Sequence, residues 1–126
     1  MDKARVTVQN VLSLLTSVTC GIPIPDDMVQ AGKTYFGYEM QEVYQSKDFD
    51  NNYVMEIVLI GKLVRLTDPT ENTVSVMDTA LEDIKTALKS LNFSYSYRDI
   101  TLDAGLRRIQ VTASALYYEK NNELIR

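Results

Sequence analysis

The chain has 126 residues, of which 45% are hydrophobic and 24% are charged, as is typical of one globular domain. Its 17 acidic residues outnumber its 13 basic residues and give a net charge of −4, which argues against tight nucleic-acid binding, because such binding depends on neutralising phosphates. The single cysteine excludes an internal disulfide, and the lack of histidine excludes the common catalytic triads and the familiar zinc sites.

The N-terminal part of the chain predicts an amphipathic helix from Lys3 to Thr19. Its apolar residues recur at helical spacing and form one stripe, which consists of Val8, Val11, Leu12, Leu15 and Val18. Gly21 is a natural C-terminal stop, and Pro23 and Pro25 prevent the helix from continuing. We expect residues 21–34 to form a connector with a single turn after Pro25.

A long antiparallel hairpin is predicted next. Phe36, Tyr38 and Met40 alternate with polar or small residues, as in a strand with one buried face. The run from Tyr53 to Leu66 is long enough to pair with this strand, which places Ser46–Asn52 at the hairpin tip.

The clearest helix signal lies between this hairpin and the C-terminal strands. Its apolar residues repeat every three or four positions, namely Met77, Leu81, Ile84, Leu88 and Leu91. Two strands are predicted after it, around Phe93–Tyr97 and Arg108–Tyr117, with a turn at Asp103–Gly105. One face of the last strand consists of Ile109, Val111, Ala113, Ala115 and Tyr117.

These elements predict a single α+β domain over residues 1–126, in the order α-β-β-α-β-β. Two helices on one face of a four-stranded, mostly antiparallel sheet form the simplest arrangement that buries every apolar face. The polar tail from Glu119 to Arg126 is expected to fray. No stretch of 18 apolar residues occurs, so we expect no contact with a membrane.

The polar residues predict no catalytic or metal site. The segment Asp48–Asn52 resembles the start of a calcium loop, but Tyr53 stands where the loop needs glycine and Leu59 where it needs glutamate. The other acidic pairs fit turns and helix surfaces better than a pair of catalytic carboxylates. We therefore expect no enzyme activity, no cofactor and no metal.

The hairpin tip is the first candidate for contact with another protein. It combines charged side chains with one exposed aromatic ring, and a projecting loop of this kind is suited to docking. The candidate residues are Lys47, Asp48, Phe49 and Asp50.

Two further places are candidates for an interface. Tyr117 and Tyr118 are adjacent in a predicted strand, so one ring must point away from the core, and tyrosine is common at interfaces. Arg107 belongs to a short basic concentration with Arg98 and Arg108. This group suits an acidic surface on a neighbouring subunit, or passing nucleic acid, although a solvated strand end explains it more readily.

The order of elements and three long stretches resemble the tail terminator (tail completion) proteins of long-tailed phages, of the lambda minor tail protein U type. The stretches are Tyr53–Leu63, the helix from Val74 to Leu91, and Leu106–Leu116. The resemblance implies a virion protein, present in the host cytoplasm before assembly, that forms a hexameric ring on the tail tube. It also implies that the ring stops polymerisation of the major tail tube protein and binds a head-completion protein, with DNA only passing through.

Two alternatives to a tail terminator remain open. One is another small binding module, either a different neck or head-completion subunit or an adaptor that recognises a peptide by strand addition. The other is an enzyme that uses carboxylates or tyrosine, which would need a deep pocket with several converging ionisable groups.

Overall fold

The computed structural model describes residues 2–47, 50–51, 53–100, 105–118 and 123–125. In chain order the elements are α1 (Asp2–Ser13), β1 (Thr19–Gly21), the 3-10 helix η1 (Asp26–Met28), β2 (Thr34–Lys47), β3 (Tyr53–Leu66), α2 (Thr73–Ser90), β4 (Ser94–Asp99), β5 (Leu106–Tyr118) and β6 (Glu123–Ile125). The α+β class agrees with the prediction. The sheet has six strands rather than the four expected.

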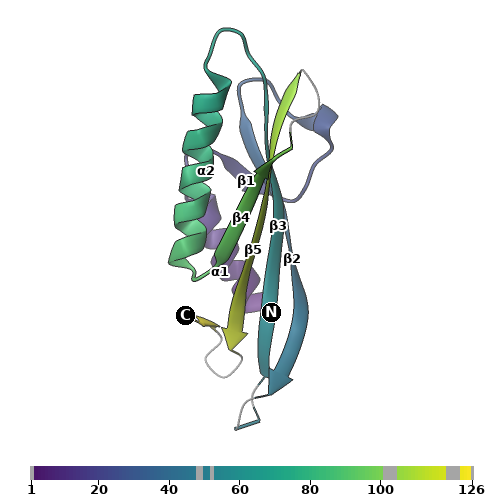
Figure 1. The fold of residues 1–126 in the computed structure, drawn as a ribbon, viewed down its shortest axis with the longest axis vertical. Coiled ribbons are helices and arrows are strands. Elements are labelled where there is room, and N and C mark those ends of the chain that lie inside the picture. The colour runs from purple at the N-terminus through teal and green to yellow at the C-terminus, as the bar shows by residue number, and fades with distance from the viewer. Residues whose placement is uncertain (1, 48–49, 52, 101–104, 119–122, 126) are drawn as a thin grey trace.

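The described strands form one sheet in the order β1-β2-β3-β5-β4, and β6 pairs with the end of β5. Only β1 runs parallel to its neighbour β2, and the other pairs are antiparallel. The predicted hairpin is confirmed as β2 and β3, which extend well past both α-helices (Figure 1). Ser46 and Lys47, which were predicted for the tip, still belong to β2.

A β-bulge interrupts the ladder between β2 and β3. Glu42 pairs with Ile57 and Tyr44 pairs with Glu56, so Val43 is the extra residue. Its side chain is exposed. Because a bulge increases the local twist of a hairpin, the far end of β2 and β3 is turned relative to the part of the sheet under the helices.

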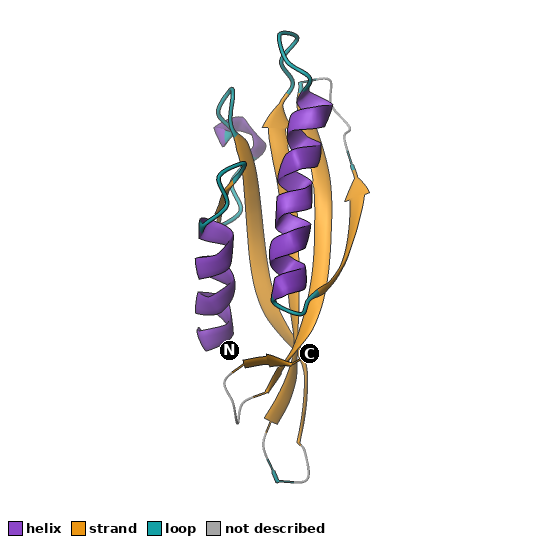
Figure 2. Ribbon diagram, turned by 90° about the vertical axis from the view of Figure 1, so that its left-hand side faces the viewer, coloured by secondary structure: helices purple, strands orange, loops and turns teal. Residues whose placement is uncertain are grey.

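Both α-helices cover the same face of the sheet, as predicted (Figure 2). Asn72 caps α2, since its Oδ1 accepts a hydrogen bond from the amide of Ser75 at 3.1 Å. The apolar sides of the helices meet the inward rows of the strands in one core. Its largest fully buried side chains are Val8, Leu12, Phe36, Ile57, Leu59, Leu63, Met77, Ile84, Leu88, Ile109 and Val111.

Gly61 of β3 leaves room for the ring of Phe36 in this core. A Cβ atom at Gly61 would lie 2.3 Å from Cζ of Phe36, far inside van der Waals contact. The same ring stacks on Tyr38, with centroids 5.7 Å apart. The glycine therefore allows two aromatic residues of β2 to stack on one another at the main core.

The connector between β1 and β2 covers part of the opposite face of the sheet. A Cβ atom at Gly37 would lie 2.7 Å from Cα of Pro23, so the connector passes directly over β2. The predicted turn after Pro25 is confirmed as η1, where Asp26 accepts a hydrogen bond from Nη2 of Arg108 at 2.6 Å. A second, smaller apolar cluster lies beneath the connector and is formed by Val29, Val64 and Leu106.

The first helix is shorter than predicted, because it ends at Ser13 rather than at Thr19. The amides of Leu14 and Leu15 bond to carbonyls three residues earlier at 3.2 Å, which tightens the last turn. Leu15 and Val18 still pack against the core, but from a non-helical segment that leads into β1. Their positions continue the apolar stripe, so periodicity could not show where the helix stops.

The C-terminal tail also differs from the prediction. Residues 123–125 form β6 and pair with Leu116, Tyr117 and Tyr118 of β5, instead of fraying. A strand of three residues is too short to show an alternating pattern, and the same holds for β1. Residues 119–122 and 126 lie outside the described residues.

Candidate interaction site at the edges of the sheet

The hairpin end, predicted as a docking loop, lies beyond both helices (Figure 1). Lys47 is the last residue of β2 and Asp50 lies in the turn, and both are exposed. Asp48 and Phe49 lie outside the described residues. The projecting end of the sheet therefore carries at least one positive and one negative side chain.

The two adjacent tyrosines of β5 lie on opposite faces of the sheet. Tyr117 is only 2% exposed and belongs to the main core, so its ring is not available to a neighbouring subunit. This placement removes Tyr117 from the interface candidates. Tyr118 points to the other face, beside Val54 of β3, and is half-buried.

The three arginines near the β4–β5 turn do not form one basic patch. Arg107 binds Asp99 at 2.9 Å on the face that α2 covers, and its Nη1 atom is buried with no hydrogen-bond partner among the described residues. Arg98 and Arg108 lie on the opposite face, where Arg98 donates to Gln110 at 3.2 Å and Arg108 binds η1. The guanidinium groups are thus divided between the two faces of the sheet.

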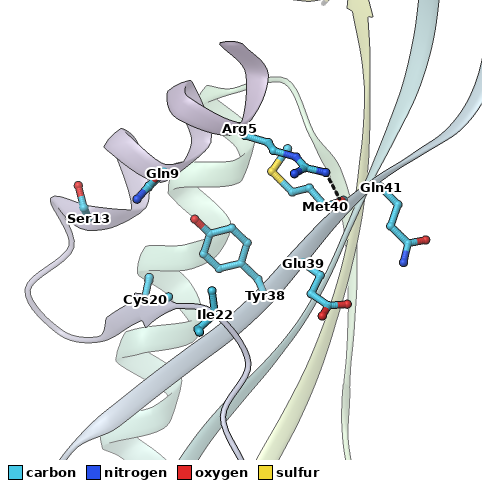
Figure 3. A pocket seen from close by; sticks show the side chains of 10 residues that line it. Arg5, Gln9, Ser13, Cys20, Ile22, Tyr38, Glu39, Met40 and Gln41 are labelled. Carbon is cyan, nitrogen blue, oxygen red and sulfur yellow. Dashed lines mark hydrogen bonds between the residues drawn. The ribbon is translucent and has the colours of Figure 1, made fainter. Parts of the chain in front are cut away.

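A groove that the sequence did not predict lies between α1 and the outer edge of β2. Its volume is about 520 Å³. In Figure 3 the ring of Tyr38 points between α1 and β1, and the side chain of Arg5 reaches down to the backbone of β2. We call it the α1–β2 groove, and its lining residues are Arg5, Gln9, Ser13, Cys20, Gly21, Ile22, Tyr38, Glu39, Met40 and Gln41.

The floor of the α1–β2 groove is an open strand edge. β1 pairs with β2 only as far as Gly37, and among the described residues no further strand continues along this edge beside Tyr38–Gln41. Nη2 of Arg5 donates a hydrogen bond to the main-chain oxygen of Met40 at 3.3 Å. The carbonyl of Met40 therefore faces the groove, where an added strand would bind.

The Cys20 thiol and the Tyr38 phenol, which both line the groove, are in their neutral forms near pH 7. Burial raises the pKa of the Cys20 thiol from 9.0 to about 11, so very little of it is the reactive thiolate. Burial also raises the pKa of the Tyr38 phenol. The groove is thus suited to binding an extended backbone and apolar side chains rather than to nucleophilic chemistry at Cys20.

The opposite edge of the sheet is formed by β4. Within the described chain β4 pairs only with β5, and all six of its residues are exposed. Tyr95 and Tyr97 lie on the helix side and are 38% and 53% exposed. Nζ of Lys85 lies 4.1 Å from the ring centroid of Tyr97, which holds that ring near α2.

The described residues contain no group of three or more acidic or cysteine side chains placed to hold a metal ion. None of the described helices has the length and apolar character needed to cross a membrane. The sequence matches no protein-family model and no curated protein.

The two open edges could not be found from the sequence, because they depend on strand order. β5 inserts between β3 and β4, so the chain neighbours β3 and β4 are not neighbours in the sheet. The exposed Tyr95 and Tyr97 were visible as alternating aromatics, but that pattern also fits a half-buried strand. The short β1, which leaves the rest of the β2 edge open, gives no periodic signal.

Proposed function

We propose that this chain is a structural subunit of a phage tail, a terminator that assembles into a ring on the tail tube. The observation that best supports this role is the presence of open strand edges at both ends of one sheet. Two different edges on one molecule make a heterologous, head-to-tail contact possible, and such contacts close into rings when the rotation between copies is right. The resemblance in element order points to the same role.

The projecting hairpin gives the ring a means of reaching a second partner. β2 and β3 extend past both helices and carry Lys47 and Asp50 at their end (Figure 2). In the proposed assembly this end contacts the tail tube, while the opposite end of the subunit meets the head-completion protein. The net charge of −4 is compatible with DNA passing through the ring without binding tightly.

A second candidate function is a peptide-binding adaptor, and the α1–β2 groove favours it. A groove between a helix and an exposed strand edge is a common way to bind an extended peptide, because the edge supplies main-chain hydrogen bonds and the groove supplies side-chain contacts. This function requires no self-association, so the mass of the purified chain in solution separates it from a ring.

The deciding experiment is electron microscopy of phage particles assembled without this chain. Loss of a terminator is expected to give over-long tails or tails without heads, and supplying the chain from a plasmid restores normal particles. Full heads joined to tails of normal length would contradict the proposed function. A defect confined to the head, with normal tail length, would favour a head-completion subunit.

A further inference from the structure

We propose that neighbouring copies of the chain join by strand addition, with β4 of one copy lying in the α1–β2 groove of the next. This inference rests on the proposed function, because it specifies how the ring is closed. It commits to a second copy as the occupant of the groove. Four properties of the two edges support it: their direction, their length, their charge and the side chains that they carry.

The first property is direction. β3 is antiparallel to β2, β5 to β3, and β4 to β5, so β4 runs opposite to β2 within one subunit. A rotation about an axis roughly along the strands preserves their directions, and it therefore brings β4 antiparallel to β2 of the next copy. The same rotation keeps the helices of both copies on one face. The sheets then continue from one subunit to the next.

The second property is length. β1 occupies the β2 edge up to Gly37, so Tyr38 is the first residue that an added strand can meet. If Asp99 lies opposite Tyr38, the six residues of β4 extend as far as Val43, where the bulge ends the regular ladder. The added strand therefore fits between β1 and the bulge.

The backbone groups support the same register. The amide of Ile100 donates a hydrogen bond to the carbonyl of Arg108, so the main-chain groups of Ile100 face β5. In a strand the main-chain groups of successive residues point to alternate sides. Those of Tyr97, three residues earlier, therefore point away from β5, toward the open edge of β4. Those of Met40 face the α1–β2 groove, as its bond to Arg5 shows. With Asp99 opposite Tyr38, Tyr97 faces Met40 and the two residues exchange main-chain hydrogen bonds, which displaces Arg5.

The third property is charge. In this register Arg98 of one copy lies directly opposite Glu39 of the next, on the face away from the helices. Both side chains are exposed in the isolated subunit. In an antiparallel ladder they would form a non-hydrogen-bonded pair, in which the Cα atoms lie about 4.5 Å apart and the side chains approach most closely. Opposite charges at such a position favour the contact and this register.

The fourth property is the set of side chains on the helix face. Tyr95 and Tyr97 are the exposed aromatics of β4, and the rotation places them over the α1–β2 groove. There they would pack near Tyr38 and Met40, which line the groove. Tyrosine gains from such burial because its hydroxyl can remain in contact with water at the rim.

The register also sets the geometry of the ring. Within one subunit Arg98 pairs across the strands with Gln110, Gln110 with Lys62, and Lys62 with Gly37, so Arg98 and Gly37 lie at the same level of the sheet. In the proposed contact Arg98 lies opposite Glu39 instead. Each copy is therefore displaced along the strands by two residues relative to the next. A ring with no net rise accommodates this stagger when its strands tilt relative to the axis, as in closed barrels.

The test is a disulfide between Glu39→Cys and Arg98→Cys in a Cys20→Ser background. Within one subunit these positions are separated by three strand spacings, about 14 Å, which is too far for a disulfide. Any bridge must therefore join two copies. Oxidation is expected to give a ladder of linked species on a non-reducing gel, whose largest member has the mass of the native ring.

Matched controls identify the register. The two single-cysteine proteins form dimers at most, and the pair Gln41→Cys with Arg98→Cys, displaced by two residues, is expected to link at least tenfold more slowly. A thermal melt verifies folding of each protein. If a cysteine protein fails to fold, the charge exchange between Glu39 and Arg98 described in the Discussion tests the same pair.

The outcomes separate this inference from the proposed function. A ring in solution without a ladder above the single-cysteine controls would overturn strand addition and leave the ring intact. A chain that is monomeric at every concentration and forms no ladder would overturn strand addition and remove the support for self-assembly. A clear ladder combined with normal tails in particles lacking the chain would support strand addition and contradict the terminator function.

Discussion

Arg5 of α1 donates a hydrogen bond from Nη2 to the main-chain oxygen of Met40 in β2, at 3.3 Å. The guanidinium thus occupies the position where an added strand would bind, and it covers part of an edge that would otherwise attract other strands.

The variant Arg5→Ala is expected to associate more readily than the parent protein. It removes the side chain that an incoming β4 must displace, so the apparent dissociation constant should fall by several-fold. Sedimentation velocity across a concentration series measures this change. Arg5→Lys retains a charged donor and serves as the matched control. Weaker association of Arg5→Ala would show that Arg5 contributes to the interface instead of protecting the edge.

The proposed contact between Glu39 of one copy and Arg98 of the next can be tested by exchanging their charges. Glu39→Arg and Arg98→Glu each place like charges opposite one another, and cross-strand charge pairs change the free energy by about 0.2–1 kcal/mol. Each single variant should therefore associate several-fold more weakly, whereas the double variant should recover. Melting temperatures should remain close to the parent value, since both side chains are exposed. Failure of the double variant to recover would contradict the proposed register.

Substitution of Gly61 by alanine is expected to destabilise the fold. The new Cβ would lie 2.3 Å from the fully buried ring of Phe36, and overpacking of a core costs about 1–3 kcal/mol. Urea unfolding measures the loss. Combining Gly61→Ala with Phe36→Leu should cost less than the sum of the two single changes, because the smaller side chain vacates the space. Additive costs would show that the strain is relieved elsewhere.

Glu71→Gln is expected to weaken the dependence of stability on acid pH. Nε and Nη2 of Arg65 bond to the two carboxylate oxygens of Glu71 at 2.8 and 2.9 Å, and the remaining Nη1 donates to Thr34. The hydrogen bonds from Arg65 are the main reason that the pKa of Glu71 lies below its ordinary value of 4.5. Its contribution to stability is therefore complete above pH 4.5 and is lost as the pH falls through the lowered pKa.

Melting temperatures between pH 6 and pH 2 measure this effect. The Glu71→Gln protein should melt at a lower temperature near neutral pH and should converge with the parent in acid. Glu82→Gln is a suitable control, because Glu82 makes an exposed pair with Lys85 on α2. Parallel curves for the parent and Glu71→Gln would exclude Glu71 as a source of the acid sensitivity.

The long elements could be predicted because each buries a continuous row of side chains. α2 and the strands β3 and β5 carry enough apolar positions for their periods to be unambiguous, and the structure confirms all three. Where an element has only three residues, as β1 and β6 do, no period exists to detect. Their formation depends on the neighbouring strand, which supplies the hydrogen bonds.

The placement of the tyrosines was only partly predictable. The adjacent pair in β5 predicted one outward ring, and both tyrosines were interface candidates. The structure shows that the outward ring is that of Tyr118, because Tyr117 continues the inward row that runs from Ile109 to Ala115. The α1–β2 groove was a different case, because it depends on where α1 ends and on how far β1 extends. Both are set by tertiary packing, which the spacing of apolar residues does not encode.

The β-bulge at Val43 separates the regular part of β2 from the part that leads to the projecting end. Beyond the bulge Met55 of β3 still belongs to the main core, whereas the end of β2 takes its orientation from this one irregular position. Adding or removing a residue there would rotate the end of β2 relative to the rest of the sheet. A change at a single point in the chain can therefore alter the direction in which the end of β2 projects.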